Sequence, residues 1–184
     1  EEAAQAEARR KAAEAAQAEA QRKAEEAARA EAQRKAEEAA QAQARKKTAE
    51  EGAQGEEEAV KVLKEAYKKK DIDVILAVMA QHRDSTEVQQ EGCNVLGHLA
   101  FNNAATRPTI AEKGGIEAVF HAMTQHSHHE EVQRCGCYVM YYMVNLESAR
   151  PAIRKGKALM DAARNNFPNN GHIQTNLNSI YADI

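Results

Sequence analysis

Histidine and cysteine side chains gather in one short stretch of the chain, where they could bind a metal ion. His126, His128 and His129 precede Cys135 and Cys137. Zinc takes four ligands of these types in a tetrahedral arrangement. Cys137 falls at a repeat position expected in the core, however, and the three histidines fall in a turn, where polar side chains are ordinary. We therefore predict no metal site and no cofactor.

Residue patterns typical of enzymes are not found in the sequence. It contains no glycine-rich phosphate loop, no Ser/His/Asp arrangement and no pair of converging carboxylates. Lys113, Gly114 and Gly115 are expected to end a helix and not to bind a nucleotide. We predict that the chain is not an enzyme.

Six polar and aromatic side chains follow a pattern that suits partner binding. They recur every four residues on two predicted helices, so on each helix they project in one direction. Tyr and Arg are enriched at the residues that dominate binding energy in interfaces. A simpler interpretation is that the tyrosines only cover the core, with their hydroxyls in water. The predicted partner-binding residues are Gln90, Asn94, His98, Arg134, Tyr138 and Tyr142.

The helices that carry these residues belong to a long internal repeat. Arg107-Pro108 recurs as Arg150-Pro151, and a partial third copy begins at Ile173-Gln174, so the unit has 42–44 residues. At an offset of 44 the identical pairs are Ile72/Ile116, Met79/Met123, Gln81/Gln125, His82/His126, Glu87/Glu131, Val88/Val132, Gln89/Gln133, Gly92/Gly136, Cys93/Cys137 and Val95/Val139.

Each unit is predicted to contain three helices. In the second unit a short helix starts near Pro108, a second covers 116–125 and a third covers 130–145. One such unit cannot bury its apolar face alone, so neighbouring units must share a continuous core. The predicted fold is all-α, an α-solenoid.

Capping boxes are expected before the third helices. Ser127 stands three residues before Glu130, and Asp84 stands three residues before Glu87 in the preceding unit. In this arrangement each side chain satisfies a free backbone N–H at the start of the helix.

The segment 88–100, VQQEGCNVLGHLA, followed by AEKGGI at 111–116, resembles the armadillo repeat. The resemblance covers roughly residues 60–184. It implies armadillo-type three-helix repeats and a protein-binding scaffold without catalysis, which uses the concave surface lined by third helices. HEAT repeats are the neighbouring alternative, but their helix pairs fit the short Pro-started segment less well.

In many armadillo proteins a Trp and an Asn on the third helix grip an extended peptide backbone. The chain has no Trp, and the matching positions do not reproduce the family's pattern of Trp and Asn. Recognition of an extended basic peptide is therefore not expected. These positions are Asn94 and His98, then Tyr138 and Tyr142, then Ser179 and Asp183.

Residues 1–59 have a different composition from the rest of the 184-residue chain. They hold 23 alanines and no Val, Ile, Leu, Met, Phe, Tyr, Trp or Cys, so they cannot build a core. A 12-residue unit occupies 11–22, 23–34 and 35–46. Its alanines are spread around a helix, since each unit turns about 120° from the last.

This composition favours a solvated single α-helix that acts as a spacer, about 70 Å long at roughly 1.5 Å per residue. Glu–Lys pairs four residues apart would support it, namely Glu7–Lys11, Glu19–Lys23 and Glu31–Lys35, with Arg10–Glu14, Arg22–Glu26 and Arg34–Glu38 in the weaker orientation. A partly disordered linker and an Ala-type coiled coil are the alternatives. The predicted domains are the helix 1–50, a glycine hinge 51–55 and the repeats 56–184.

Charge and hydropathy limit the kinds of partner. The net charge is −4 for residues 1–59 and +1 for 60–184, so no basic domain suggests nucleic acid. The longest uncharged apolar runs are 74–80 and 138–144, too short for membrane insertion. Three cysteines in a chain that needs no disulfide indicate a reducing compartment, and the predicted location is cytoplasmic.

The predicted function is a non-catalytic protein-protein interaction scaffold that binds a protein or peptide on the concave face. One alternative is a cytoskeletal or axonemal-type structural component whose long helix binds a lattice. Another is an accessory repeat region of a larger signalling protein. Self-association is also expected, through an apolar open end of the solenoid after Asp183.

Overall fold

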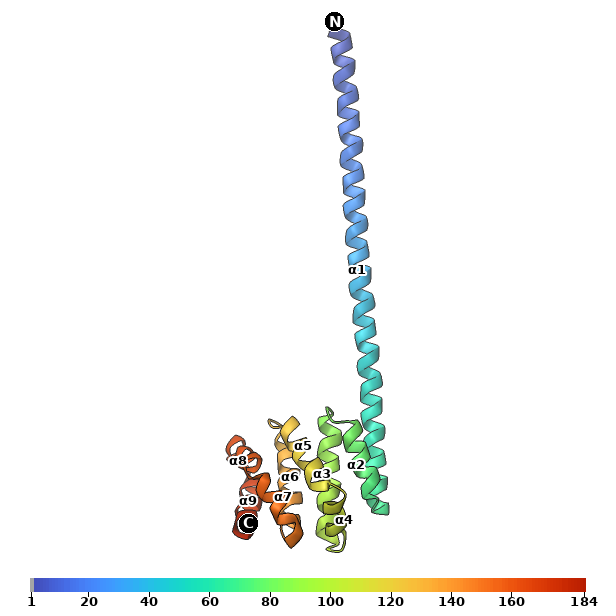
Figure 1. Cartoon of the computed structure of the whole chain (residues 1–184). Helices are drawn as coiled ribbons and strands as arrows, with labels where there is room; N and C mark the ends of the chain where they lie inside the picture. Colours follow the sequence, from blue (N-terminus) through green and yellow to red (C-terminus); the bar gives the residue numbers. More distant parts are fainter. Residues whose placement is uncertain (1) are drawn as a thin grey trace. The chain divides into compact units, whose positions relative to one another are not determined.

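The chain is all-helical in the computed structural model, which describes the backbone of residues 2–184 (Figure 1). Side chains are described in this range except for 2–18, 20–21, 24–25, 27–28 and 44–51. No β-strand occurs between residues 2 and 184. The elements are α1 (Glu2–Lys69), α2 (Ile72–Gln81), α3 (Thr86–Asn102), α4 (Thr106–Glu112), α5 (Gly115–Gln125), α6 (Glu130–Met143), the 3₁₀ turn η1 (Glu147–Ala149), α7 (Arg150–Lys155), α8 (Lys157–Asn166) and α9 (Gly171–Asp183).

The chain divides into two units, Glu1–Gly52 and Ala53–Ile184. In the first unit the side chains of 29–43 are all exposed, as a solvated helix requires. Lys23 Nζ lies 2.7 Å from Glu19 Oε1, and Lys35 Nζ lies 2.6 Å from Glu31 Oε1. Such exposed pairs each contribute a few tenths of a kcal/mol to helix stability.

Other ion pairs expected in this unit have different outcomes. Glu7–Lys11 and Arg10–Glu14 lie outside the side chains that the structure describes. The pairs Arg22–Glu26 and Arg34–Glu38, which have the weaker orientation, lie among the described side chains but do not approach within the 4.0 Å of an ion pair.

The expected hinge at 51–55 is helical, because α1 continues through Gly52 and Gly55 to Lys69. Each glycine costs about 1 kcal/mol relative to alanine inside a helix. The residues that follow offset this cost: Lys61 Nζ lies 2.9 Å from Glu57 Oε1, and Val60 and Leu63 are buried. Packing in the second unit thus extends the helix beyond the glycines.

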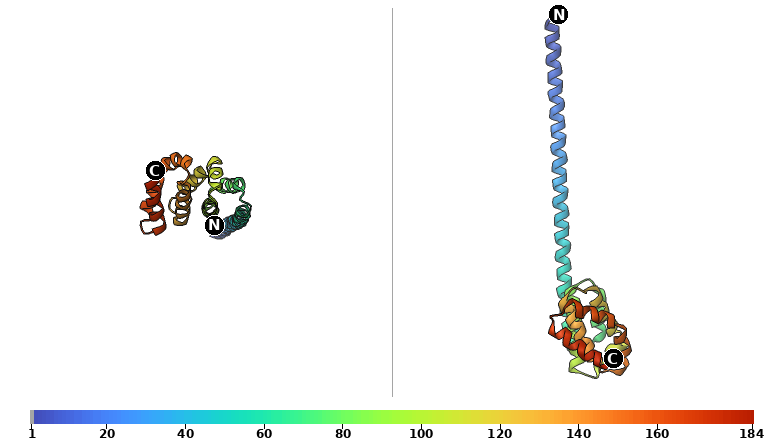
Figure 2. Two further views of the ribbon diagram at one scale, coloured as in Figure 1. Left: turned by 90° about the horizontal axis from the view of Figure 1, so that it is seen from below. Right: turned by 90° about the vertical axis from the view of Figure 1, so that its left-hand side faces the viewer.

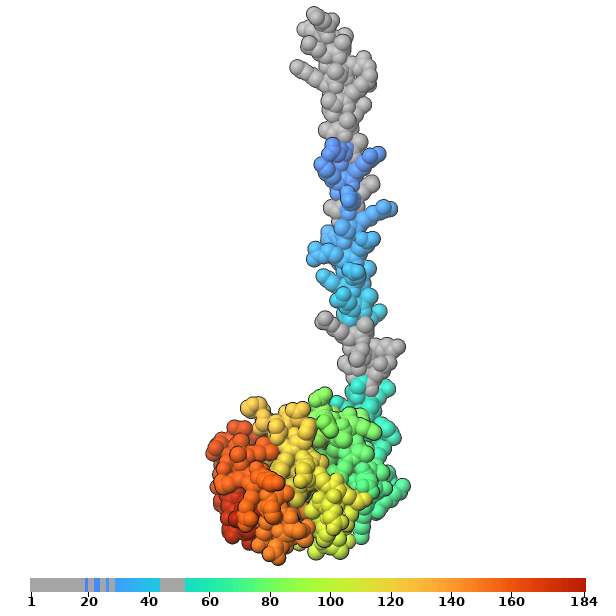
Figure 3. Space-filling model, viewed as in Figure 1, coloured from blue at the N-terminus to red at the C-terminus, as the bar shows by residue number. Residues whose placement is uncertain are grey.

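The second unit is built from helix pairs in two layers. In each pair one helix packs against the next in the chain, α2 on α3, α5 on α6 and α8 on α9. Helices α3, α6 and α9 contact one another in sequence to form one layer, and α2, α5 and α8 form the other (Figure 2). The space-filling view shows consecutive segments lying beside one another in chain order (Figure 3).

A glutamine occupies the same place in all three pairs and fixes their register. The Gln89 side-chain amide donates to the carbonyls of Met79 (2.8 Å) and His82 (2.9 Å). Gln133 does the same to Met123 (2.7 Å) and His126 (3.1 Å), and Gln174 to Arg164 and Phe167 (both 3.1 Å). Each amide thereby joins the last turn of one helix to the first turn of the next. The third copy is aligned with the second at an offset of 41 residues.

The ends of the predicted helices are only partly as expected. Gly114 adopts φ +80°, a conformation that favours glycine, and α4 ends at Glu112 just before it. The N-caps are different from the prediction: Ser85 Oγ accepts from the Val88 N–H, and His129 Nδ1 accepts from the Val132 N–H. Asp84 and Ser127 stand too early, because the first helical hydrogen bonds are accepted by the carbonyls of Ser85 and His129.

The three cysteines are buried free thiols. Burial raises the pKa of Cys135 to about 11 and that of Cys137 to about 12, and it also raises the pKa of Cys93. The folded state therefore keeps protons that the unfolded chain releases above pH 9.

We expect the free energy of unfolding to fall as the pH rises above 9. The stabilisation is complete below the unfolded pKa and is lost as the pH rises through 11 for Cys135 and 12 for Cys137. For Cys135 alone the loss is about 2 kcal/mol by pH 11. Urea unfolding at a series of pH values measures it, and a Cys135→Ala, Cys137→Ala variant should have a flatter profile. An equally steep profile in that variant would remove the thiols as the cause.

The face of α8 and α9 that points away from α5 and α6 is polar. In the register set by the glutamines, Asn178 and Tyr181 stand where α6 has the buried Cys137 and Met140. Arg164 Nη2 donates to Asn178 Oδ1 (2.8 Å), and the Tyr181 hydroxyl donates to Asp161 Oδ1 (2.7 Å). Self-association through this face stays a prediction.

Placing the apolar residues of the second unit at the equivalent positions of this surface should strengthen self-association. A variant with Arg164→Met and Tyr181→Met, which copies Met123 and Met140, exposes thioether and methylene groups that seek burial. Sedimentation velocity should show that it dimerises about tenfold more tightly than the wild type, a gain of about 1.4 kcal/mol. Equal sedimentation of the two proteins would show that the polar network does not control association.

Candidate functional site

Side chains from α3, α6 and α9 line a groove of about 310 Å³ in the second unit. Five of the six predicted partner-binding residues lie in it, and Gln90 does not. Three further residues complete the lining. The full set is Asn94, His98, Arg134, Tyr138, Tyr141, Tyr142, His172 and Asn176.

The helical repeat explains why these side chains meet. Asn94 and His98 of α3 are partly buried, whereas the nearby Cys93 and Leu96 of the same helix are buried in the core. On α6 the partly buried Tyr138 follows the buried Cys137 in the same way. Because α3 contacts α6 and α6 contacts α9, one row of residues from each helix faces the groove.

Aromatic rings form a continuous cluster along the groove and its edge. His98 stands edge-on to Tyr138 (ring centroids 5.8 Å apart) and to Tyr67 of α1 (6.3 Å). Tyr142 lies 4.9 Å from Tyr138, 4.9 Å from Tyr141 and 5.1 Å from Phe101. Edge-to-face contacts of this kind hold the rings in fixed orientations. We call Tyr67, His98, Phe101, Tyr138, Tyr141 and Tyr142 the aromatic cluster.

The cluster is partly buried, and its edge is exposed. Phe101 is 52% exposed, which is unusual for a phenylalanine. Arg107 belongs to α4, and its Nε donates to the carbonyl of Ala100 on α3 (2.8 Å). Its guanidinium lies 5.9 Å from the centre of the Tyr142 ring. Arg107 thus joins the end of α3 to the cluster.

Gly97 provides the space in which the Tyr138 ring lies. A Cβ atom built on Gly97 would stand 2.5 Å from Tyr138 Cδ1, closer than such atoms approach. Only a residue without a side chain lets the ring lie flat against α3. Burial, with a smaller contribution from the Tyr142 hydroxyl, raises the pKa of Tyr138 to about 12. Its hydroxyl therefore stays protonated to a higher pH than that of an ordinary tyrosine.

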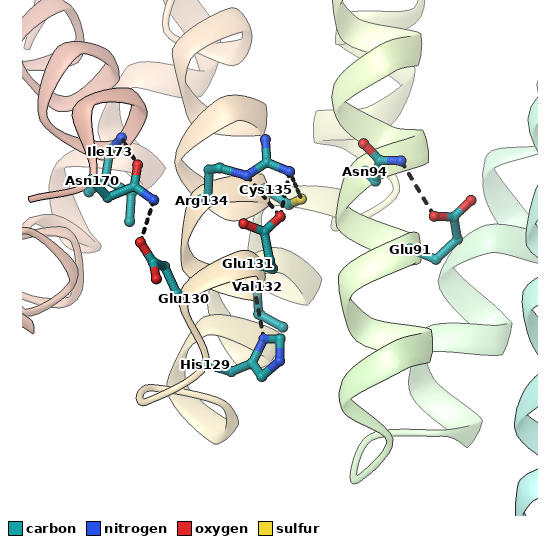
Figure 4. Close-up of polar contacts among 10 residues, drawn as sticks. All are labelled: Glu91, Asn94, His129, Glu130, Glu131, Val132, Arg134, Cys135, Asn170 and Ile173. Atoms are coloured by element: carbon teal, nitrogen blue, oxygen red, sulfur yellow. Dashed lines mark hydrogen bonds and ion pairs between the residues drawn. The ribbon is translucent and has the colours of Figure 1, made fainter. Parts of the chain in front are cut away.

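Charged side chains near the groove pair with one another (Figure 4). Arg134 donates from Nε (2.9 Å) and Nη2 (2.7 Å) to Glu131 Oε2, which lowers the pKa of Glu131 and raises that of Arg134. Asn94 Nδ2 donates to Glu91 Oε2 at 3.4 Å. The groove has one cation in its lining, and a carboxylate one turn away neutralises that cation.

His126, His129 and the two cysteines at 126–137 have structural positions, whereas His128 is exposed. His126 bridges to the preceding unit, with Nδ1 3.2 Å from Thr86 Oγ1 and Nε2 2.9 Å from the Arg83 carbonyl. His129 caps α6, and Cys135 and Cys137 are buried. Among the side chains that the structure describes, no three His, Cys, Asp or Glu residues are placed to hold a metal ion.

Five groove or cluster residues were not among the predicted set, namely Tyr67, Phe101, Tyr141, His172 and Asn176. His172 and Asn176 are four residues apart on α9, but the repeat places Ser179 and Asp183 at the positions equivalent to Tyr138 and Tyr142, so the pattern of the first two units does not select them. Tyr141 lies beside that spacing, one residue before Tyr142. Tyr67 precedes the recognisable repeat and reaches His98 only through the packing of α1 on α3, which no local pattern reveals.

Comparison with known proteins gives no relative. No family model matches the chain, and no curated protein or solved structure matches it significantly. None of the helices formed by the described residues has both the length and the apolar character needed to cross a bilayer.

Proposed function

We propose that the chain is a non-catalytic protein-interaction module, an α-solenoid of armadillo-type repeats that binds an extended segment of a partner protein. One observation carries the proposal: equivalent helices of three consecutive units contribute side chains to one groove. An extended peptide laid across α3, α6 and α9 would contact all three units. The repeated glutamine bonds support the repeat assignment, since they join each helix pair in the same way.

The chemistry of the groove also supports recognition of a protein. Its lining combines three tyrosines with an arginine, two asparagines and two histidines. Tyrosine offers a large apolar ring and a hydroxyl for little loss of side-chain entropy, which suits binding surfaces. We propose further that residues 1–50 act as a helical spacer beside this module and that the protein is cytoplasmic.

A double substitution tests the proposal. Peptides selected from a random library on the full chain should bind about tenfold or more weakly to a Tyr138→Ala, Tyr142→Ala variant, because most of the binding energy of an interface lies in a few such residues. His121→Ala on α5 is the control, since His121 lies outside the groove lining and should leave affinity unchanged. Circular dichroism checks that each variant is folded. Equal affinity of the folded double variant and the wild type would place binding elsewhere.

A further inference from the structure

We propose that the groove binds an uncharged, proline-rich segment in the polyproline II conformation. This inference rests on the proposed function and names the class of partner for the same site. Three features of the groove carry it: its paired charges, its aromatic rings and its hydrogen-bond donors.

The charges of the groove favour a partner without charge. Arg134 is the one Lys or Arg in the lining, no Asp or Glu lines it, and Glu131 already occupies the Nε and Nη2 groups of Arg134. An acidic peptide would have to compete with Glu131 for this guanidinium. A basic peptide would meet Arg134, and the nearest carboxylates, Glu91 and Glu131, already accept hydrogen bonds from Asn94 and Arg134. Unpaired or like charges brought together in an interface oppose binding, so an uncharged segment is the complement.

The aromatic cluster offers flat apolar surfaces at fixed positions. The rings of Tyr138 and Tyr142 meet at 83° and those of Tyr141 and Tyr142 at 76°, so neighbouring rings present differently oriented surfaces. Gly97 fixes the seat of Tyr138. Aromatic-lined grooves of this type accept polyproline II segments, which are already extended before binding and lose little entropy.

The groove offers several hydrogen-bond donors to the carbonyl groups of such a peptide. The tyrosine hydroxyls and the Asn176 amide can donate, and so can the Arg134 N–H groups that Glu131 does not occupy. Proline has no N–H group, and the carbonyls of a polyproline II chain have no internal partners. A proline-rich segment therefore presents mainly acceptors, which these side chains can satisfy without leaving buried N–H groups unpaired.

Binding of four matched peptides to the full chain tests this proposal. Each has about ten residues, about 30 Å in the polyproline II conformation. One is proline-rich and uncharged, the second has each proline replaced by alanine, the third is glutamate-rich and the fourth is arginine-rich. Fluorescence anisotropy should give about tenfold tighter binding of the first peptide than of the others. Its Kd should change less than about twofold between about 50 and 500 mM salt, because no charge pair forms.

Variants distinguish the failure of this inference from the failure of the proposed function. Tyr142→Ala should weaken binding of the proline-rich peptide about tenfold, whereas Tyr142→Phe, which keeps the ring, should weaken it less than about threefold. His121→Ala should have no effect. Tighter binding of the alanine, glutamate or arginine peptide that still depends on Tyr142 would overturn the inference and leave the groove as the binding site. If no peptide of any class, random-library peptides included, binds in a Tyr142-dependent way, both proposals fail.

Discussion

Gly97→Val is expected to lower the free energy of unfolding of the second unit by about 2–3 kcal/mol and to abolish partner binding, because overpacking a filled core displaces its neighbours. The first added carbon would lie 2.5 Å from Tyr138 Cδ1 and 3.5 Å from Val139 Cγ2. The Tyr138 ring must move, and its contacts with the His98 and Tyr142 rings are then lost. Urea unfolding and peptide affinity measure the two effects.

Two further variants show whether the clash with Tyr138 causes the loss of stability in Gly97→Val. Gly52→Ala meets no atom within 4 Å, so it should instead stabilise its helix, by about 1 kcal/mol. Adding Tyr138→Ala to Gly97→Val should recover part of the lost stability, since contacting residues do not act additively. Additive effects of the two substitutions would show that Gly97 and Tyr138 are not coupled.

Gln133→Ala is expected to destabilise the second unit by about 2–4 kcal/mol, because it removes two hydrogen bonds and leaves buried carbonyls unpaired. Those carbonyls belong to Met123 and His126, at the end of α5. Gln89→Ala should have a similar effect, since its amide makes the same two bonds in the preceding unit. Gln174→Ala should cost less, because its two bonds are longer and only part-buried.

Gln90→Ala is the matched control. Gln90 adjoins Gln89 on α3, but its side chain makes no hydrogen bond with the described part of the chain and is partly exposed. Its replacement should change stability by no more than about 0.5 kcal/mol, as for ordinary surface positions. Urea unfolding compares the four variants. A Gln133→Ala protein as stable as Gln90→Ala would contradict the role of the repeated glutamine in holding the units in register.

Much of the second unit could be predicted because its repeat is visible in the sequence. The offset of 44 places Gln89 and Gln133 at equivalent positions, and Ile173-Gln174 marks the partial third copy that the structure aligns by its hydrogen bonds. The spacing of four residues brought five of the six chosen side chains into one groove. Gln90 is outside the lining, although Arg134, at the equivalent position of α6, is part of it.

Features that depend on contacts between helices could not be predicted. The N-caps are Ser85 and His129 and not the predicted Asp84 and Ser127. Several polar residues in each turn could cap the helix, and tertiary packing selects among them. Nothing in the sequence around Gly97 indicates that a ring from α6 fills its place. The register of the third copy does not reveal that Asn178 and Tyr181 form hydrogen bonds with Arg164 and Asp161 of α8.

The position of a bound peptide on the chain is the most direct test of the central claim, that the groove between α3, α6 and α9 is the binding site. Nuclear magnetic resonance of the full chain with labelled tyrosine and histidine rings can locate it, using a peptide selected on the wild type. Binding in the groove should shift the ring signals of His98, Tyr138 and Tyr142 and leave that of His121 unchanged. Shifts confined to His121 and its neighbours, with Tyr138 and Tyr142 unaffected, would contradict the claim.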